Sequence, residues 1–360
     1  MAHKTVSTIL MPRVGFISSR MTTIEALGLD ALAAMPDTLR ALPQDRIPLR
    51  TFDMVGLNAL RLVVAETAAA ASNEQPDIRP PMPAISGVDR LADELSTAGT
   101  GLIIMMGKGG VGKTTVAAAL ALGLVQRGRS VHLSTTDPAA HISATLEGAM
   151  EGLQVDRIDP KAETQKYIEK IMTQRASDLD ADGLALLRED LESPCTEEVA
   201  VFHAFSRIVA EARSHFVVLD TAPTGHTLLL MDATAAYHRQ MTRDVAPSTQ
   251  GRIITPLMRL QDAKYSKIIL VALPETTPVS EAAALQEDLR RASIEPYAWV
   301  INRSLLGTGT RDPVLTARLA GEEAQIRRVQ DGLSKRLFLL PWQAVPPVGL
   351  ESLSKLTRKP

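Results

Sequence analysis

The residue types best suited to chemistry gather in one glycine-rich segment. It reads Gly107, Lys108, Gly109, Gly110, Val111, Gly112, Lys113, Thr114 and Thr115. The segment satisfies the pattern G-x-x-x-x-G-K-[ST], in which glycines let backbone amides approach phosphate oxygens closely. Lys113 would neutralise the β- and γ-phosphates of a nucleoside triphosphate, and the hydroxyl of Thr114 would bind Mg²⁺. The segment therefore predicts a phosphate site for a magnesium-bound nucleoside triphosphate.

A second interpretation of the same glycines is a dinucleotide-binding loop. Gly107, Gly109 and Gly112 also fit the spacing G-x-G-x-x-G. A dinucleotide loop has no use for Lys113 and Thr114, whereas a triphosphate with Mg²⁺ needs both residue types. The pattern as a whole favours the triphosphate.

Two aspartates follow apolar runs elsewhere in the chain. Asp137 follows the run at 130–135, and Asp220 follows the run at 215–219. Ligands of open α/β sheets gather at the carboxyl ends of strands, where a carboxylate can hold magnesium-bound water or orient an attacking water. The alternative for either residue is a helix N-cap. Asp137 directly precedes a proline and suits both roles.

The elements that must position these residues are predicted by hydrophobic patterning. Short, continuously apolar runs alternate with helical patterns, which is typical of strands buried on both faces of a parallel sheet. A helix is expected from Thr114 to Gln126, with its positive end at the phosphate. The strand candidates are 102–106, 130–135, 215–219, 267–273, 297–301 and 336–340. The predicted fold is a mostly parallel, doubly wound α/β sheet with helices on both faces.

Two features divide the chain into parts. Four prolines at 74–83 predict an extended linker over residues 71–87. The interval between the second and third strand candidates is longer than a crossover needs, so a helical insertion is expected at about 151–212. Residues 88–360 then form the main domain, and residues 1–70 precede the linker.

The segment before the linker echoes the C-terminal part of the chain. Ile47, Val55, Gly56, Leu57 and Leu60 have the same spacing as Leu340, Val348, Gly349, Leu350 and Leu353. Chance is one explanation, since these residue types are common. The other is that residues 1–70 are the remnant tail of a preceding homologous module.

Composition excludes several classes of protein. The chain has 360 residues, of which 45% are hydrophobic and 22% charged, as in globular proteins. The net charge is −2, whereas a dedicated nucleic-acid binder usually has a clear excess of positive charge, so no nucleic-acid partner is expected. The single cysteine, Cys195, precludes a disulfide within the chain and suits a reducing cytosol. No apolar run approaches the ~18 residues that span a bilayer, and the N-terminus makes a poor signal peptide.

Three motifs together resemble the arsenite-pump ATPase family, a deviant Walker class of P-loop NTPases. They are residues 107–115 with the extra Lys108, TTDPAAH at 135–141 and DTAPTGHT at 220–227. The resemblance runs from about Gly87 to Leu356. More specifically, this region resembles the C-terminal half of the double-length protein, because SPCTEE at 193–198 and LPETTPV at 273–279 both match that half. It implies that residues 1–70 are the tail of a preceding ATPase module.

The resemblance also implies roles for individual residues. Lys108 resembles the signature lysine, which acts at an interface with a second nucleotide module. Asp137 would lie near Mg²⁺ and the attacking water, and Asp220 would link hydrolysis to the following helix. Asn302 resembles the asparagine that contacts adenine. The alternative for Asn302 is a turn residue at the end of a strand.

A metalloid site is implied by the same family, in which cysteines with histidine and serine bind trivalent arsenic or antimony between two modules. The matching residues are Cys195, His226 and Ser193. Ser193 suits an N-cap and Pro194 the first helical position, which places Cys195 second. A helix N-terminus favours thiolate, the form that binds soft ions, whereas a lone cysteine can also be a small buried hydrophobe. Because this chain has one thiol, a second must come from a homodimer or a separate N-terminal module.

The predicted function is a Mg²⁺-dependent ATPase that energises extrusion of arsenite or antimonite through a separate membrane carrier. The chain would be cytoplasmic and would reach the inner face of the membrane through that partner. One alternative is a nucleotide-gated module of the tail-anchored-protein targeting type, although the CxxC pair common in that branch is missing. The other is a half-ATPase that is inactive without its partner module.

Overall fold

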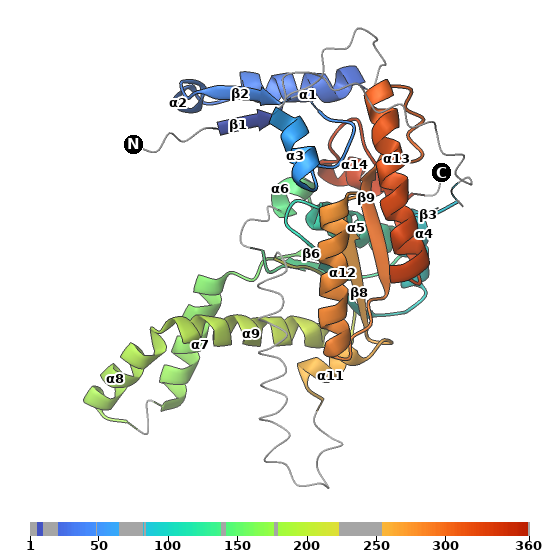
Figure 1. The fold of residues 1–360 in the computed structure, drawn as a ribbon. Coiled ribbons are helices and arrows are strands. Elements are labelled where there is room, and N and C mark those ends of the chain that lie inside the picture. Colours follow the sequence, from blue (N-terminus) through green and yellow to red (C-terminus); the bar gives the residue numbers. More distant parts are fainter. Residues whose placement is uncertain are drawn as a thin grey trace.

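The fold is given by a computed structural model that describes residues 6–9, 21–47, 49–64, 82, 84–137, 142–175, 179–222 and 254–358. Its centre is an eight-stranded parallel sheet in the order β3-β10-β9-β8-β4-β7-β5-β6 (Figure 1). The strands are β3 (Ser86–Gly87), β4 (Gly101–Met106), β5 (Val131–Thr135), β6 (Leu153–Val155), β7 (Phe216–Asp220), β8 (Ser266–Ala272), β9 (Ala298–Ser304) and β10 (Leu337–Pro341). The predicted doubly wound α/β fold is confirmed.

All six apolar runs predicted as strands form strands, and two edge strands escape prediction. The six runs correspond to β4, β5, β7, β8, β9 and β10. The two others, β3 with two residues and β6 with three, lie at the opposite edges of the sheet. An edge strand is not buried like a central one, so β6 lacks the continuous apolar run that marks the others.

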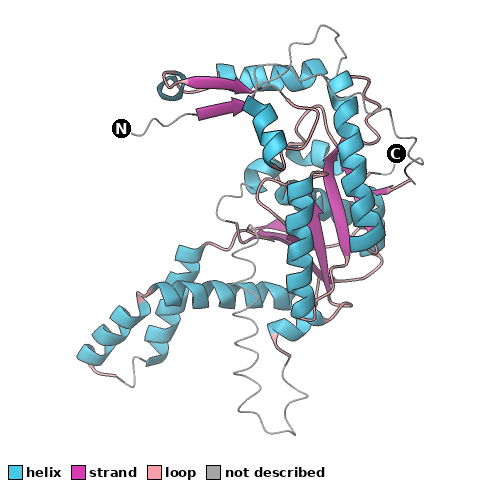
Figure 2. Ribbon diagram, viewed as in Figure 1, coloured by secondary structure: helices cyan, strands magenta, loops and turns pink. Residues whose placement is uncertain are grey.

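Helices cover both faces of the sheet, as Figure 2 shows. Alternation along β4 sends Ile103 and Met105 into one core and Leu102, Ile104 and Met106 into the other. The first core is covered by α4 (Val88–Ser96), α5 (Lys113–Gln126), α6 (Ile142–Leu146) and α14 (Gly349–Lys355). The second is covered by α9 (Pro194–Glu211), α11 (Pro256–Gln261), α12 (Thr276–Arg291) and α13 (Pro313–Arg328), with the π-helical turn η2 (Val329–Leu333) after α13.

A helical arm projects from the sheet between β6 and β7 (Figure 1). It consists of α7 (Pro160–Arg175), α8 (Ala181–Leu191) and α9, and its last helix returns to the sheet. The helices begin at Pro160, later than the expected 151, because β6 pairs with β5 and belongs to the sheet. Within the described part of the chain, no helix combines the length and apolar character that crossing a membrane requires.

The N-terminal segment has the same topology as the C-terminal end of the main domain. It contains β1 (Val6–Ile9), α1 (Met21–Ala33), α2 (Asp37–Arg40), β2 (Gln44–Ile47) and α3 (Leu57–Val64). Val6 pairs in parallel with Gln44, and Trp299 of β9 pairs with Leu337 of β10 at an equal separation along the chain. The echo in spacing therefore extends to strand register and to the helices α1 and α3, which correspond to α13 and α14.

A loop of the N-terminal segment contacts the main domain at the start of α12. Oδ2 of Asp53 accepts hydrogen bonds from the backbone N–H (2.9 Å) and the hydroxyl (2.8 Å) of Thr276. Arg318 donates to the carbonyl of Arg50 at 3.0 Å. Asp53 thus serves as a cap for α12 from outside the helix, which has no side-chain cap of its own.

Candidate nucleotide-binding site

The glycine-rich segment is the loop between β4 and α5, as the sequence predicts. The strand ends at Met106 and the helix begins at Lys113. Between them Gly107, Gly110 and Gly112 have φ angles of +150°, +81° and +88°, which residues with a Cβ rarely adopt. The loop therefore owes its shape to its glycines, and its backbone leads into the positive end of α5.

Close neighbours also require two of these glycines. A Cβ on Gly107 would lie 2.3 Å from the carbonyl oxygen of Val271, and a Cβ on Gly112 would lie 2.2 Å from Nδ2 of Asn302. That Nδ2 donates to the carbonyl of Val111 at 2.9 Å, and Oδ1 of Asn302 accepts from the next backbone N–H at 2.9 Å. Asn302 is buried and supports the loop from β9. Contact with adenine stays a prediction.

Lys113 brings a buried positive charge to the loop. Its Nζ donates to the carbonyl oxygen of Lys108 at 3.1 Å, across the loop. Burial lowers the pKa of Lys113, and the nearby charges of Asp220 and Asp137 oppose this effect. The ammonium and the two predicted carboxylates therefore share one site at the carboxyl ends of the strands.

Asp220 and Thr114 form the second part of the site. Oδ2 of Asp220 accepts from the hydroxyl of Thr114 at 2.7 Å and from that of Thr135 at 3.3 Å. Asp220 is fully buried, and its Oδ1 has no hydrogen-bond partner among the residues that the structure describes. Burial raises the pKa of Asp220 to about 6, against the opposing effects of Thr114 and Lys113.

This donor set suits Mg²⁺. A buried oxygen without a partner requires a cation or water, and Mg²⁺ prefers hydroxyl, carboxylate and water oxygens. Thr114 and Asp220 supply the protein oxygens, and Lys113 lies on the phosphate side of the same helix start. The residues present thus meet the requirements of a magnesium-bound phosphate.

Asp137 lies at the edge of this site. Its backbone N–H donates to the hydroxyl of Thr135 at 3.0 Å, and its carboxylate acts on both Lys113 and Asp220. The alternative N-cap role involves residues 138–141, which lie outside the described residues. Asp137 is half-buried.

Threonines that the sequence reasoning passed over connect the two segments after β5 and β7. The hydroxyl of Thr221 donates to the carbonyl of Met105 at 2.7 Å, and that of Thr136 accepts from the backbone N–H of Ala222 at 3.1 Å. The backbone N–H of Thr136 donates to the carbonyl of Asp220 at 2.9 Å. These threonines belong to the motifs at 135–141 and 220–227. The motifs therefore contained the signal, but the sequence analysis assigned roles only to their aspartates.

Lys108 lies at the surface of the loop. Its Nζ is 2.7 Å from Oε1 of Glu281 on α12, and both side chains are partly exposed. No local sequence motif predicts the contact with Glu281, because that residue is far from Lys108 along the chain. The expected role of Lys108 at an interface with a second module stays a prediction.

Of the predicted metalloid residues, Ser193 and Cys195 lie at the N-terminus of α9, in the arm and away from α5 (Figure 1). Ser193 is the N-cap and Pro194 the first residue of α9, as predicted, so Cys195 is the second. Cys195 is exposed, which excludes the alternative of a buried hydrophobe. The Ser193 hydroxyl lies 3.2 Å from that of Thr196. His226 lies outside the described residues.

Comparison with known proteins finds one matching family model and several relatives. The sequence model of a family described as "Anion-transporting ATPase" matches residues 100–260. An "Arsenical pump-driving ATPase" of Escherichia coli is 48% identical over 329 residues, which cover 91% of this chain and 56% of the relative. A protein with the same description from Acidiphilium multivorum is 48% identical over the same shares. "ATPase get3" of Schizosaccharomyces japonicus is 24% identical over 71% of this chain and 90% of its own.

The chain spans a little over half the length of the arsenical pump-driving ATPases of Escherichia coli and Acidiphilium multivorum that it matches. Since 91% of the chain is aligned, the similarity includes residues before the linker as well as the phosphate loop. The loop geometry, the paired aspartates and these alignments lead to one assignment: residues 100–260 belong to the anion-transporting ATPase family of P-loop NTPases, and the chain is similar over 91% of its length to proteins described as arsenical pump-driving ATPases.

Proposed function

We propose that the chain hydrolyses ATP with Mg²⁺. The observation that carries this proposal is the Thr114–Asp220 pair, with its buried, unpartnered carboxylate oxygen, beside the buried Lys113 at the start of α5. Backbone amides of the loop would bind phosphate oxygens, and Lys113 would neutralise the β- and γ-phosphates. Thr114 and Asp220 would hold Mg²⁺, which supplies neutralisation of phosphate charge when bound.

Asp137 is proposed to orient the attacking water. Its position after β5, within electrostatic range of Lys113, is that of a carboxylate beside the γ-phosphate. Asp220 is proposed to report hydrolysis to the rest of the chain. Its carboxylate accepts a hydrogen bond from the Thr114 hydroxyl, and the hydroxyl of its neighbour Thr221 donates to the carbonyl of Met105 in β4. A change at the phosphate would therefore be transmitted to the backbone after β7.

The proposed role of hydrolysis is to drive export of arsenite or antimonite through a separate membrane carrier, with the chain held at the inner face of the membrane by that carrier. Support comes from the relatives described as arsenical pump-driving ATPases and from the exposed Cys195 at the N-terminus of α9, beside Ser193. His226 would complete the metalloid ligands.

A second ATPase module is part of the proposal. The chain aligns to 56% of the E. coli relative, and its N-terminal segment repeats the topology and register of β9-α13-β10-α14. Both facts support residues 1–70 as the tail of a preceding ATPase module. The second module would be another copy of this chain or a separate N-terminal module, and either would supply the further thiol that a metalloid site needs.

The test is ATP turnover by the purified full chain. Lys113→Ala should lower turnover at least about 100-fold, because it removes the charge at the transferred phosphate. Lys161→Ala, on the exposed side of α7, serves as the matched control and should keep wild-type turnover. Absence of any affinity for ATP or ADP with Mg²⁺ would refute the proposal.

The coupling is tested in the same assay by adding arsenite or antimonite. Turnover should rise with either metalloid, and Cys195→Ala should remove that stimulation. Turnover that ignores metalloid in the wild-type chain would refute the export role and leave the ATPase role. The half-ATPase alternative, favoured by the 56% coverage, predicts no turnover until the N-terminal module of a double-length relative is added.

A further inference from the structure

Two histidines and a glutamate converge at the end of the sheet opposite the phosphate loop. The ligand atoms of His132, Glu211 and His215 all lie within 4.8 Å of one another. Oε2 of Glu211 is 2.8 Å from Nδ1 of His132 and 3.9 Å from Nε2 of His215. This His-Glu-His cluster has no part in the proposed nucleotide or metalloid sites.

Two of the three residues belong to regular elements, and His215 directly precedes the strand β7. His132 of β5 pairs in register with Val217 of β7. Since side chains alternate along a strand, His215 lies on the same face as Val217 and therefore beside His132. Glu211 is the last residue of α9, and the short turn that follows leads to His215. The helix α9 and the strand β5 thus hold Glu211 and His132, and His215 is held where the chain enters β7.

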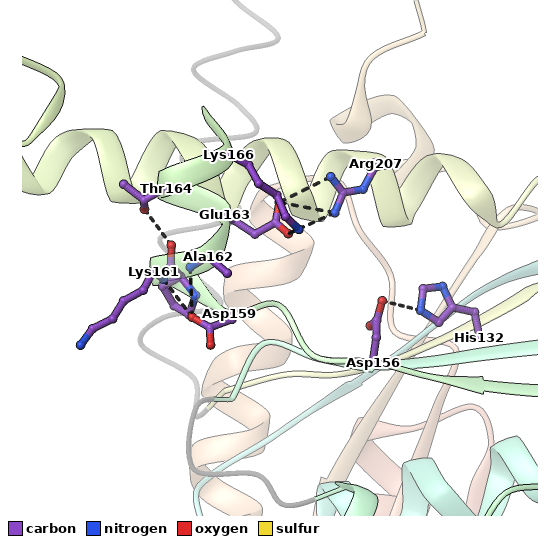
Figure 3. Close-up of polar contacts among 10 residues, drawn as sticks. His132, Asp156, Asp159, Lys161, Ala162, Glu163, Thr164, Lys166 and Arg207 are labelled. Carbon is purple, nitrogen blue, oxygen red and sulfur yellow. Dashed lines mark hydrogen bonds and ion pairs between the residues drawn. The ribbon is translucent and has the colours of Figure 1, made fainter. Parts of the chain in front are cut away.

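Asp156 lies beside the second ring nitrogen of His132. The His132 side chain is only 3% exposed, and its Nε2 lies 3.0 Å from Oδ2 of Asp156, toward which it points in Figure 3. Histidines that bind metal ions usually donate their second ring N–H to a carboxylate, which leaves the other nitrogen free to bind. In a neutral His132 whose Nε2–H donates a hydrogen bond to Asp156, the lone pair of Nδ1 faces Oε2 of Glu211 at 2.8 Å. That arrangement requires a positive charge between the two atoms.

A proton on His132 would satisfy only part of the cluster. It would join His132 to Asp156 and Glu211, whose oxygens lie 3.0 and 2.8 Å from its two ring nitrogens. Nε2 of His215 would gain no hydrogen-bond partner from that proton. That atom is shielded from solvent and has no hydrogen-bond partner in the described ranges, while Nδ1 of the same ring lies 3.0 Å from the Ser214 hydroxyl. One ion bound by all three side chains satisfies each of them.

We propose that His132, Glu211 and His215 bind a divalent transition-metal ion, with Zn²⁺ the best match. Two imidazoles and one carboxylate are a common zinc donor set, with water in the fourth position. Ligand atoms of a tetrahedral zinc site lie about 3.3 Å apart. The separations of 2.8 and 3.9 Å lie on either side of that value.

The surroundings also favour a cation. The C-terminal end of α9, where Glu211 lies, carries the negative end of the helix dipole. A cavity of about 300 Å³, lined by His132 and His215 among others, gives room for the water ligand and for entry of the ion. The ion would tie the inner end of α9 to β5 and β7, and the outer end of the same helix carries Cys195. The site would therefore anchor the arm.

The test measures Zn²⁺ binding to the full chain after removal of metal with a chelator. Calorimetry should show one Zn²⁺ per chain, and Co²⁺ should give the intense visible bands of a tetrahedral complex. His215→Asn should weaken Zn²⁺ binding at least about 10-fold and remove the Co²⁺ bands. His215 is used because its side chain is 25% exposed, so its replacement spares the buried contact between His132 and Asp156.

Two variants serve as controls. His203→Asn changes a histidine of α9 that stacks on Tyr167 outside the cluster, and should leave Zn²⁺ binding unchanged. Cys195→Ser should also leave it unchanged. Equal Zn²⁺ affinity in wild type and His215→Asn, loss of binding in Cys195→Ser, or no binding at about 100 µM Zn²⁺ would each overturn the proposal. The last result would mean that His132 is held by a proton alone.

Discussion

The N-terminal unit β1-α1-β2-α3 and the C-terminal unit β9-α13-β10-α14 have the same order and strand register but different surroundings. Leu60 of α3 and Leu353 of α14 are at corresponding positions, yet Leu60 is 52% exposed and Leu353 is fully buried. Leu57 is 72% exposed, whereas its counterpart Leu350 packs against the main core. The C-terminal unit joins six more strands, and the N-terminal unit has a two-stranded sheet.

The comparison separates what a local pattern decides from what neighbours decide. The spacing of apolar residues produces the same helix in both units, because a helix forms from its own periodicity. Burial of that helix depends on strands contributed from elsewhere, and only α14 receives them, beside α5 and α6. The exposed leucines of α3 are therefore what the proposal of a truncated preceding module predicts.

The largest expected difference is in stability. Leu353→Ala should lower the free energy of unfolding by about 2–5 kcal/mol, because it leaves a cavity in the core. Leu60→Ala should lower it by less than about 0.5 kcal/mol, because the side chain is largely exposed. Urea denaturation of the two variants measures both. Equal losses would mean that a second copy of the chain covers α3 in solution.

Prediction from sequence succeeded where the signal was local. The strands β4 and β7 follow from runs that are apolar without interruption, and the position of the glycine-rich loop between β4 and α5 follows from a contiguous motif. Binding of phosphate by this loop stays a prediction. The edge strand β6 escaped because three half-exposed residues give no such run.

Contacts between distant segments could not be predicted. Glu281 reaches Lys108 from α12, and Asn302 reaches the loop from β9. Likewise His132 meets Glu211 only because β5, β7 and α9 pack together. Such partners depend on strand order and register, which no local spacing encodes.

A second contrast concerns Glu322 of α13, whose counterpart in α1 is the exposed Leu29. Oε2 of Glu322 accepts from the backbone N–H of Leu305 at 2.7 Å and from the Ser304 hydroxyl at 3.1 Å. Burial raises the pKa of Glu322 to about 7, against these hydrogen bonds and the charge of Arg318, while Glu275 adds to the increase.

The sign of the pH effect follows from this shift. The folded chain keeps a proton on Glu322 that the unfolded chain loses above its ordinary pKa of 4.5, so stability falls as pH rises from about 4.5 to 7 and is level above. Glu322→Gln should remove this fall and be more stable than wild type at pH 8 by about 1–3 kcal/mol. Thermal unfolding at pH 5 and 8 measures it. Glu323→Gln is the control, and a Glu322→Gln variant with the wild-type pH profile would contradict the prediction.

A third contrast is at the strand end, where Asn302 of β9 corresponds to Ile9 of β1. Asn302→Asp replaces the donor to the Val111 carbonyl with an acceptor and adds a negative charge beside the phosphate loop. Affinity for ATP and for GTP should both fall at least about 10-fold, since the loss concerns the loop that both nucleotides share. Nucleotide titration with Mg²⁺ measures this. A loss confined to ATP would indicate that Asn302 acts on adenine instead.

The smallest effect is expected where the N-terminal unit contacts α12 of the main domain. Asp53 lies before α3, and the corresponding residue of the C-terminal unit, Pro346, has no side-chain acceptor for a helix N-terminus. Asp53→Ala removes both hydrogen bonds to Thr276 and a negative charge at the start of α12. It should lower the free energy of unfolding by about 1 kcal/mol and speed hydrogen exchange at the Thr276 amide. Asp53→Asn keeps an acceptor oxygen and should lose less. Unchanged exchange at Thr276 in Asp53→Ala would mean that Asp53 of the N-terminal unit does not stabilise the start of α12.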